Sequence, residues 1–252
     1  MGSFSDRVAI VTGGGSGIGR AVCTQLASEG AHVVVADLRE DRTHDVVAEI
    51  LAAGGSASAA PGDLSDPSVV TRVVDETVAS QHRLDVLVAN AGIMDDMSGP
   101  EEVSDEMWER VIRVNLTAPF LLTRAVAPHM LARASGSIVY TASEAGMRGS
   151  AAGTAYTVSK HGLIGLMRSG AVLYRNRGVR VNAVAPGGTK TNLEVNLNVQ
   201  SEGLKAIGAY SGNVGRIAEA SEVAAAIVFL ASDAASNVSG ALLASDGGWV
   251  AV

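Results

Sequence analysis

Short apolar runs alternate along the chain with longer segments in which apolar residues recur at helical spacing. Most of these runs are apolar throughout, without the polar alternation of a half-exposed strand. Strands of that kind are buried on both faces, which is typical of a parallel sheet covered by helices. The runs predict seven strands, at Val8–Thr12, His32–Asp37, Ser56–Gly62, Leu84–Ala89, Gly136–Thr141, Val179–Ala185 and Ala241–Ala244.

The helices predicted between these strands carry start and stop signals. Asp66-Pro67 combines an N-cap residue with a proline in the first turn, and Gly54-Gly55 ends the preceding helix. We expect Pro119 and Pro128 to interrupt a long helical stretch, because proline lacks the N–H that a helix interior needs. The helical segments are Gly17–Ser28, Asp41–Ala53, the one that starts at Asp66, Ser104–Leu131, Thr154–Asn176 and Ser221–Ala231.

The regular alternation predicts an α/β fold, a Rossmann-like doubly wound parallel sheet of seven strands with helices on both faces. The sequence shows no linker and no repeat, so we expect residues 1–252 to form a single domain. Residues 186–219 contain scattered Gly and Asn and predict a long structureless loop. Long loops in such folds often act as lids, and we place a substrate lid at about residues 189–215.

Composition narrows the classes of function. The net charge is -7 and no basic stripe is visible, which argues against nucleic acid as a partner. The first six residues lack the apolar core of a signal peptide, and no apolar run reaches the roughly 18 residues of a membrane span. The single cysteine, Cys23, fits a reducing compartment, so we expect a cytoplasmic protein. The five histidines lack paired metal-ligand spacing, and no metal site is expected.

Tyr156 and Lys160 stand four residues apart in a predicted helix, so their side chains share one face. A free tyrosine, with a pKa of about 10, does little acid–base work at neutral pH. A neighbouring ammonium group favours the phenolate, and we therefore expect Lys160 to lower the pKa of Tyr156. The pair indicates a tuned proton donor and acceptor, although Tyr-x-x-x-Lys also arises by chance in many helices.

A glycine-rich turn over Thr12–Gly19 follows the first strand and opens the first helix. Glycines let backbone N–H groups approach a phosphate, and a helix N-terminus favours negative charge, so this placement predicts a dinucleotide site. Asp37 ends the second strand, where a carboxylate can accept the ribose hydroxyls and repel a 2′-phosphate. Arg39 raises the opposite possibility of a phosphate clamp, but Asp37 stands at the strand end itself and favours NAD.

Several motifs together resemble the classical short-chain dehydrogenases/reductases. They are Thr12–Gly19, Asn90-Ala91-Gly92, Asn115, Ser143, Tyr156, Lys160 and Pro186-Gly187, and their order and spacing cover essentially the whole chain. Ala89 stands where the family has a first Asn, a mild departure, and Ser16 stands where NADP-dependent members commonly have a basic residue. The resemblance implies an NAD site made of Gly13, Ser16, Gly17, Ile18, Gly19, Asp37, Asp63, Leu64, Asn90, Ala91, Gly92, Tyr156, Lys160, Pro186, Gly187 and either Thr189 or Thr191.

The resemblance also implies a reaction and a role for each of four catalytic residues. Tyr156 would give a proton to a ketone oxygen or take one from a secondary alcohol, and Ser143 would hold that oxygen. Lys160 would act on the Tyr156 pKa and hold the nicotinamide ribose, with Asn115 as the fourth member. Family resemblance further suggests a homotetramer, and the apolar C-terminal residues 248–252 fit burial against a partner subunit.

Other side chains near these motifs are less specific. Asp95 and Asp96 could contact a substrate, but we favour a solvated loop for both. We interpret Cys23 as a core residue. Glu144, Met94 and Met147, together with the lid, are candidates for contacts with a small ketone or secondary alcohol.

Two alternative functions stay open. The first is an acyl-thioester ketoreductase of fatty-acid type with NADPH as donor, for which Arg133, Arg175 and Arg177 would form a basic patch facing a carrier protein. The net charge and Asp37 argue against it. The second is a nucleotide-binding sensor without catalytic activity, but such proteins can lose the Tyr and Lys that this chain has.

Overall fold

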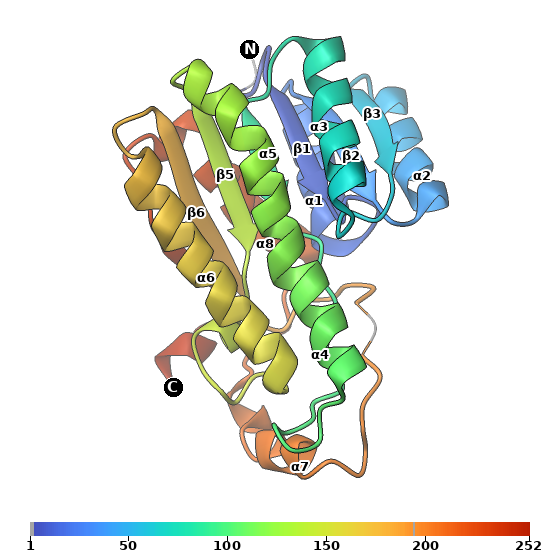
Figure 1. Ribbon diagram of the computed structural model, residues 1–252, viewed down its shortest axis with the longest axis vertical. Coiled ribbons are helices and arrows are strands. Elements are labelled where there is room, and N and C mark those ends of the chain that lie inside the picture. Colours follow the sequence, from blue (N-terminus) through green and yellow to red (C-terminus); the bar gives the residue numbers. More distant parts are fainter. Residues whose placement is uncertain (1–2, 194) are drawn as a thin grey trace.

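The computed structural model describes residues 3–193 and 195–252. Within them, seven strands form one parallel sheet in the order β3-β2-β1-β4-β5-β6-β7 (Figure 1). The order reverses between β1 and β4, the point at which doubly wound sheets bind ligands. All seven predicted strands are confirmed, with small shifts at their ends, as β1 (Val8–Thr12), β2 (His32–Asp37), β3 (Ser56–Pro61), β4 (Val86–Ala89), β5 (Gly136–Thr141), β6 (Val179–Pro186) and β7 (Leu242–Ser245).

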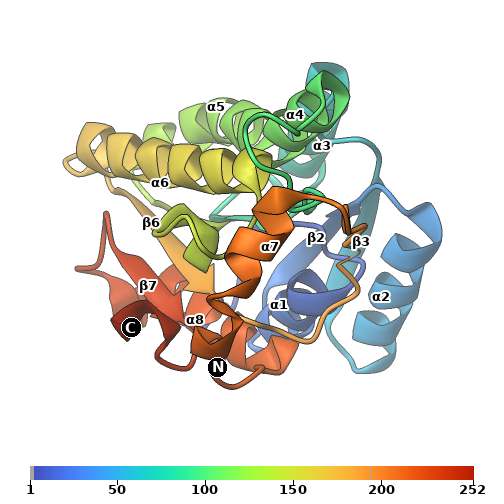
Figure 2. The ribbon, with the colours of Figure 1, turned by 90° about the horizontal axis from the view of Figure 1, so that it is seen from below.

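Helices cover both faces of the sheet, as Figure 2 shows from below. Successive strand residues point to opposite faces, so Val8 and Ile10 enter one core while Ala9 and Val11 enter the other. Side chains of α3, α5 and α6 complete the first core, and those of α1, α2 and α8 complete the second. The helices are α1 (Gly17–Ser28), α2 (Glu40–Ala52), α3 (Pro67–Gln81), α4 (Asp105–Ile112), α5 (Ala118–Ala132), α6 (Thr154–Tyr174), α7 (Glu202–Gly208) and α8 (Ala220–Ala231).

The long helical stretch that begins after Ser104 changes its hydrogen-bonding pattern once, just before Pro119. A π-helical segment, Arg113–Thr117, separates α4 from α5, and Pro119 lies in the first turn of α5. The interruption predicted at Pro128 was wrong, because α5 runs through that proline. Its neighbours in α5 are buried in the core, and their burial outweighs the one lost backbone hydrogen bond.

The segment predicted as a structureless loop, residues 186–219, is partly folded, so that prediction was wrong. It contains α7 and a 3-10 turn over Ser211–Asn213, and its two ends pair where Thr189 bridges Ala218. Helix α7 buries none of its residues within this chain and is only seven residues long, so no apolar pattern announces it. It lies beyond the carboxyl ends of the strands (Figure 1), as a lid would; residue 194 of the proposed lid lies outside the described residues.

Cys23 is buried in the core, as predicted. No helix within residues 3–193 and 195–252 is both long and apolar enough to cross a bilayer, and no cluster of His, Cys, Asp or Glu among them could hold a metal ion.

Candidate active site

The glycine-rich turn between β1 and α1 folds back on itself. A Cβ atom at Gly19 would lie 2.1 Å from the Gly13 carbonyl oxygen, so only glycine fits this contact between backbone segments. Ser16 is the N-cap residue of α1 and makes no side-chain cap hydrogen bond. Ile18, in the first turn of α1, is half-buried and packs against the core. The backbone N–H groups at the start of α1 can therefore bind phosphate oxygens.

The side chain of Asn90 joins three strand ends at the centre of the site. Its amide donates to the Thr12 carbonyl at 3.1 Å, and its oxygen accepts from the Thr141 hydroxyl at 3.1 Å. The Thr12 hydroxyl in turn accepts from the N–H groups of Asn90 and Ala91, both at 3.0 Å. Gly92 follows, and a Cβ there would lie 3.6 Å from Lys160 Nζ. This turn therefore links the glycine-rich turn to α6, the helix that carries Tyr156 and Lys160.

Asp37 is half-buried and already holds backbone groups at the end of β2. One carboxylate oxygen accepts from the Gly15 N–H and the other from the Arg39 N–H, both at 3.0 Å. The Arg39 guanidinium forms an ion pair with Asp41 at 2.9 Å. A second arginine lies against the glycine-rich turn: Arg42 Cβ is 2.9 Å from the place a Cβ of Gly15 would take. Sequence reasoning missed Arg42, which follows the strand by five positions.

The remaining predicted cofactor residues fall into two groups. Asp63 is exposed, where it accepts from the N–H and hydroxyl of Ser65, whereas Leu64 is buried in the core between the sheet and α3. At the other end of the site, Pro186 is buried and the Gly187 N–H donates to the Ser245 carbonyl at 3.1 Å.

The structure separates Thr189 from Thr191. The Thr189 hydroxyl donates to the Gly187 carbonyl at 3.1 Å and stays at the end of β6. Thr191 lies against the glycine-rich turn, with its Cβ 3.1 Å from the place a Cβ of Gly17 would take. The two threonines therefore lie at different ends of the predicted dinucleotide site.

Ser143, Tyr156 and Lys160 come together at the carboxyl edge of the sheet. Ser143 follows β5, and its hydroxyl shares a hydrogen bond with the Tyr156 hydroxyl. Tyr156 lies in the first turn of α6, and Lys160 follows one turn later. The Lys160 ammonium donates to the Thr141 carbonyl at 2.9 Å and is 5.3 Å from the centre of the Tyr156 ring. These contacts give one spot where a carbonyl oxygen can meet a proton donor.

Asn115 is fully buried in the π-helical segment and does not join this spot directly. Its oxygen accepts from the Ile93 N–H at 2.9 Å, and its amide donates to the Ile93 carbonyl at 2.9 Å and to the Ser159 hydroxyl at 3.2 Å. The side chain thus fastens the connection after β4 to α6, next to Lys160.

Burial governs the protonation of the pair. It raises the pKa of Tyr156 to about 12; the Ser143 hydrogen bond opposes this shift, and the negative charge of Asp95 adds to it. Burial also lowers the pKa of Lys160 to about 8. The expectation that Lys160 brings the pKa of Tyr156 below its ordinary value is therefore not met by the protein groups alone. The same apolar surroundings that disfavour the phenolate also disfavour the ammonium form of Lys160, although a pKa of about 8 leaves Lys160 mostly charged at neutral pH.

Two residues near the site differ from their sequence interpretation. Glu144, a candidate for substrate contact, is fully buried behind Ser143 and pairs with Arg148 at 3.1 Å. Burial and a hydrogen bond with Asp246 raise its pKa to about 7. Asp95, interpreted as part of a solvated loop, is only 2% exposed. The spacing of hydrophobic residues could not reveal the burial of Glu144 or Asp95, because both residues are acidic and lie beside glycine-rich loops.

The arginines suggested for a carrier-protein patch lie at the wrong end of the molecule. Arg175 directly follows α6, 19 residues after Tyr156, which along a helix amounts to about 28 Å. It lines a 380 Å³ cavity with Gly136 and Val179, at the amino ends of β5 and β6. Arg133 approaches Asp85 at 4.0 Å near the same edge of the sheet. The basic patch expected for an acyl-thioester ketoreductase is therefore not formed at the site by these residues.

The regions of known proteins that match this chain include the whole site. The family model of the short chain dehydrogenases matches residues 7–202. Cis-4-hydroxycyclohexanecarboxylate dehydrogenase of Sinomonas cyclohexanicum is 43% identical over 250 residues, covering 99% of this chain and 99% of the relative. Cyclohexanol dehydrogenase of Acinetobacter sp. (strain SE19) is 38% identical over 246 residues, covering 98% and 96%.

A solved structure agrees equally well. A Beutenbergia cavernae protein named as an NAD(P) dependent gluconate 5-dehydrogenase, with NADP bound at low occupancy, superposes with a TM-score of 0.88 at 43% identity over 100% of both chains. The matched region contains the glycine-rich turn, Ser143, Tyr156 and Lys160 in one continuous stretch. The chain therefore belongs to the short-chain dehydrogenase family of oxidoreductases.

Proposed function

We propose that this protein interconverts a secondary alcohol and a ketone by hydride transfer, with NAD as cofactor and Tyr156 as general acid and base. The observation that carries the proposal is the meeting of Ser143, Tyr156 and Lys160 beside the glycine-rich turn. Both relatives described above are named for a hydroxylated cyclohexane ring, so we propose a cyclic secondary alcohol as substrate.

The residues at the switch point of the sheet fit a dinucleotide. The uncapped start of α1 suits a pyrophosphate, and the glycine-rich turn keeps side chains away from it. Asp37 suits an adenosine ribose, while Lys160 and the residues after Pro186 suit the nicotinamide end. The bound nicotinamide would supply or accept the hydride.

The chain's own contribution is to hold and move one proton at the Tyr156 hydroxyl. With a pKa of about 12, Tyr156 stays protonated at neutral pH and is ready to protonate a ketone oxygen. Ser143 bonds to the same hydroxyl, so it can orient the substrate oxygen towards that proton. In the reverse direction the hydroxyl must first lose its proton, and Lys160, which a pKa of about 8 leaves mostly charged at neutral pH, favours that loss.

The choice of NAD over NADP rests on charge at the end of β2. Asp37 would repel a 2′-phosphate, and Ser16 offers no positive charge to bind one. Arg42 and the NADP in the Beutenbergia cavernae structure point the other way. We give Asp37 more weight than Arg42, because the Gly15 N–H holds the Asp37 carboxylate at the turn itself.

We further propose a homotetramer, as the family resemblance implies, and a cytoplasmic location, which the single cysteine fits. Phe120 of α5 and Leu173 of α6 are exposed apolar side chains on neighbouring helices, which suits a subunit interface. The C-terminal tail fits only in part, because Trp249 is buried in its own chain beside Arg148 while Val250 and Val252 are exposed.

Light scattering should give about four times 25.6 kDa, and a monomer mass would contradict the tetramer.

Replacing Tyr156 by Phe removes only the hydroxyl, so NADH should still bind, as followed by its fluorescence. Turnover of cyclohexanol with NAD, followed by NADH absorbance, should fall by about 10²–10⁴-fold, the usual contribution of a general acid–base. Tyr174→Phe makes the same change at the far end of α6 and serves as the matched control. Retained turnover in Tyr156→Phe would remove this residue from the reaction.

Replacing Asp37 by Asn removes the charge but leaves an oxygen for the Gly15 N–H. We expect the ratio of kcat/KM with NAD to kcat/KM with NADP to exceed one in the wild-type protein and to fall by about tenfold, or 1.4 kcal/mol, in the variant. Asp45→Asn, exposed on α2, is the control for net charge. An unchanged ratio would show that Asp37 does not select the cofactor.

Replacing Lys160 by Met tests the buried charge. The lysine pKa is 10.5 ordinarily and about 8 in the fold, so between these values the unfolded chain binds more protons. As the pH rises through this window the buried charge is lost, so the free energy of unfolding of the wild-type protein should increase relative to that of Lys160→Met. Urea unfolding at pH 7, 8, 9 and 10, at one protein concentration, measures the difference; a difference that is constant with pH would contradict the shift.

A further inference from the structure

Asp95 is a buried carboxylate that the proposed reaction does not use. It lies in the connection between β4 and α4, and its polar contacts are with backbone N–H groups. One oxygen accepts from Met97 and Gly153, each at 3.2 Å, and the other accepts from Tyr156 at 2.9 Å. Asp95 therefore binds the backbone of the residue that carries the proton.

These contacts supply a cap that α6 lacks by itself. The N-cap residue of α6 is Gly153, which has no side chain to bind the first N–H groups of the helix. Asp95 takes this place from 58 residues earlier in the chain. A Cβ at Gly153 would lie 2.6 Å from the Asp95 carboxylate, so the glycine makes room for the distant cap. Its negative charge also suits the positive end of the α6 dipole.

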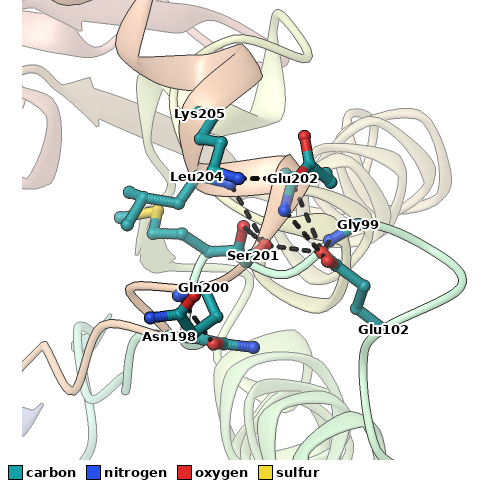
Figure 3. A network of polar contacts seen from close by, with 10 residues as sticks. Gly99, Glu102, Asn198, Gln200, Ser201, Glu202, Leu204 and Lys205 are labelled. Atoms are coloured by element: carbon teal, nitrogen blue, oxygen red, sulfur yellow. Dashed lines mark hydrogen bonds and ion pairs between the residues drawn. The ribbon is translucent and has the colours of Figure 1, made fainter.

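The same connection also holds the lid. The Glu102 carboxylate accepts from the Ser201 hydroxyl and from the N–H groups of Glu202, at 2.9 Å, and Gly203, at 3.3 Å, at the start of α7 (Figure 3). These hydrogen bonds lower the pKa of Glu102 to about 2, and the bond from Ser201 has the largest effect.

Two more backbone contacts complete the link. The Asn198 N–H of the lid donates to the Asp96 carbonyl at 3.0 Å. The Thr154 N–H of α6 donates to the Ser98 carbonyl, also at 3.0 Å. Residues 95–102 thus contact the lid on one side and the first turn of α6 on the other.

We propose that Asp95 is a positioning residue for Tyr156, and that residues 95–102 couple docking of α7 to the placement of the catalytic tyrosine. The proposal rests on the proposed role of Tyr156. It means that a lid seated on Glu102 steadies the first turn of α6, where Asp95 holds the N–H of Tyr156. A cyclic alcohol that draws α7 down would thereby tighten the proton donor it needs.

The chemical test replaces Asp95 by Asn, which keeps the shape but removes the charge and one acceptor. We expect kcat for cyclohexanol oxidation to fall by about tenfold, because Tyr156 is less well placed, with KM for NAD unchanged. The charge of Asp95 raises the pKa of Tyr156, so the rising limb of the pH–kcat profile should move to lower pH. Asp96→Asn makes the same charge change one residue later and is the control, because its oxygen can still accept from the Ser98 N–H.

If Asp95→Asn only impaired folding, the yield of protein would fall but the rising limb of the pH–kcat profile would not move. If both the limb and kcat stay at wild-type values, the positioning role is overturned. Gly153→Ala provides a second variant, because its Cβ displaces the carboxylate while the charge remains. It should lower kcat in the same way. A wild-type kcat in a folded Gly153→Ala protein would contradict the cap.

The coupling is tested without turnover, so failure of the proposed reaction does not obscure it. Glu102→Ala removes a side chain that reaches the surface and should fold normally. Hydrogen–deuterium exchange of the amides of residues 153–157 should become faster in this variant, with Glu101→Ala as the neighbouring control. Exchange at the wild-type rate in Glu102→Ala would overturn the coupling, whatever the role of Tyr156 proves to be.

Discussion

The hydrogen bonds of Asn90 at the ends of β1, β4 and β5 are the constraint on which the site depends. Parallel strands end at one edge, but nothing in their pairing fixes how far apart the loops that follow will lie. Asn90 fixes it by binding the Thr12 carbonyl and the Thr141 hydroxyl at once. The glycine-rich turn is held on one side, and on the other the Thr141 carbonyl is placed to receive Lys160. Loss of this amide would leave buried polar groups without partners.

Water exclusion then decides the chemistry of the groups gathered there. The same burial raises the pKa of Tyr156 and lowers that of Lys160, so neither side chain behaves as it would in water. A cation four residues away along a helix does not by itself make a tyrosine acidic. Ser143 acts against the burial, because its hydrogen bond lowers the pKa of Tyr156. Glu144 responds to burial like Tyr156, with a pKa raised to about 7.

The connection after β4 does more than complete a nucleotide site. Asn115 fastens its beginning to α6 through Ile93, Asp95 caps α6 from its middle, and Glu102 holds α7 at its end. One loop therefore contacts the cofactor edge, the catalytic helix and the lid. If the proposed positioning role holds, this arrangement suits an enzyme whose relatives are named for different ring alcohols, because the lid could vary while the loop kept Tyr156 in place.

The sequence by itself determined the parallel sheet, the position of nearly every strand and helix, and the family. Apolar runs, caps such as Asp66 and a glycine-rich turn are local signals, and they can be recognised without knowledge of distant contacts. The tertiary structure alone decided that α5 continues through Pro128, that α7 exists, and that Asp95 and Glu144 are buried. It also decided the direction of the Tyr156 pKa shift. Each of these depends on contacts between residues far apart in the chain, and on the water those contacts exclude, which no local pattern records.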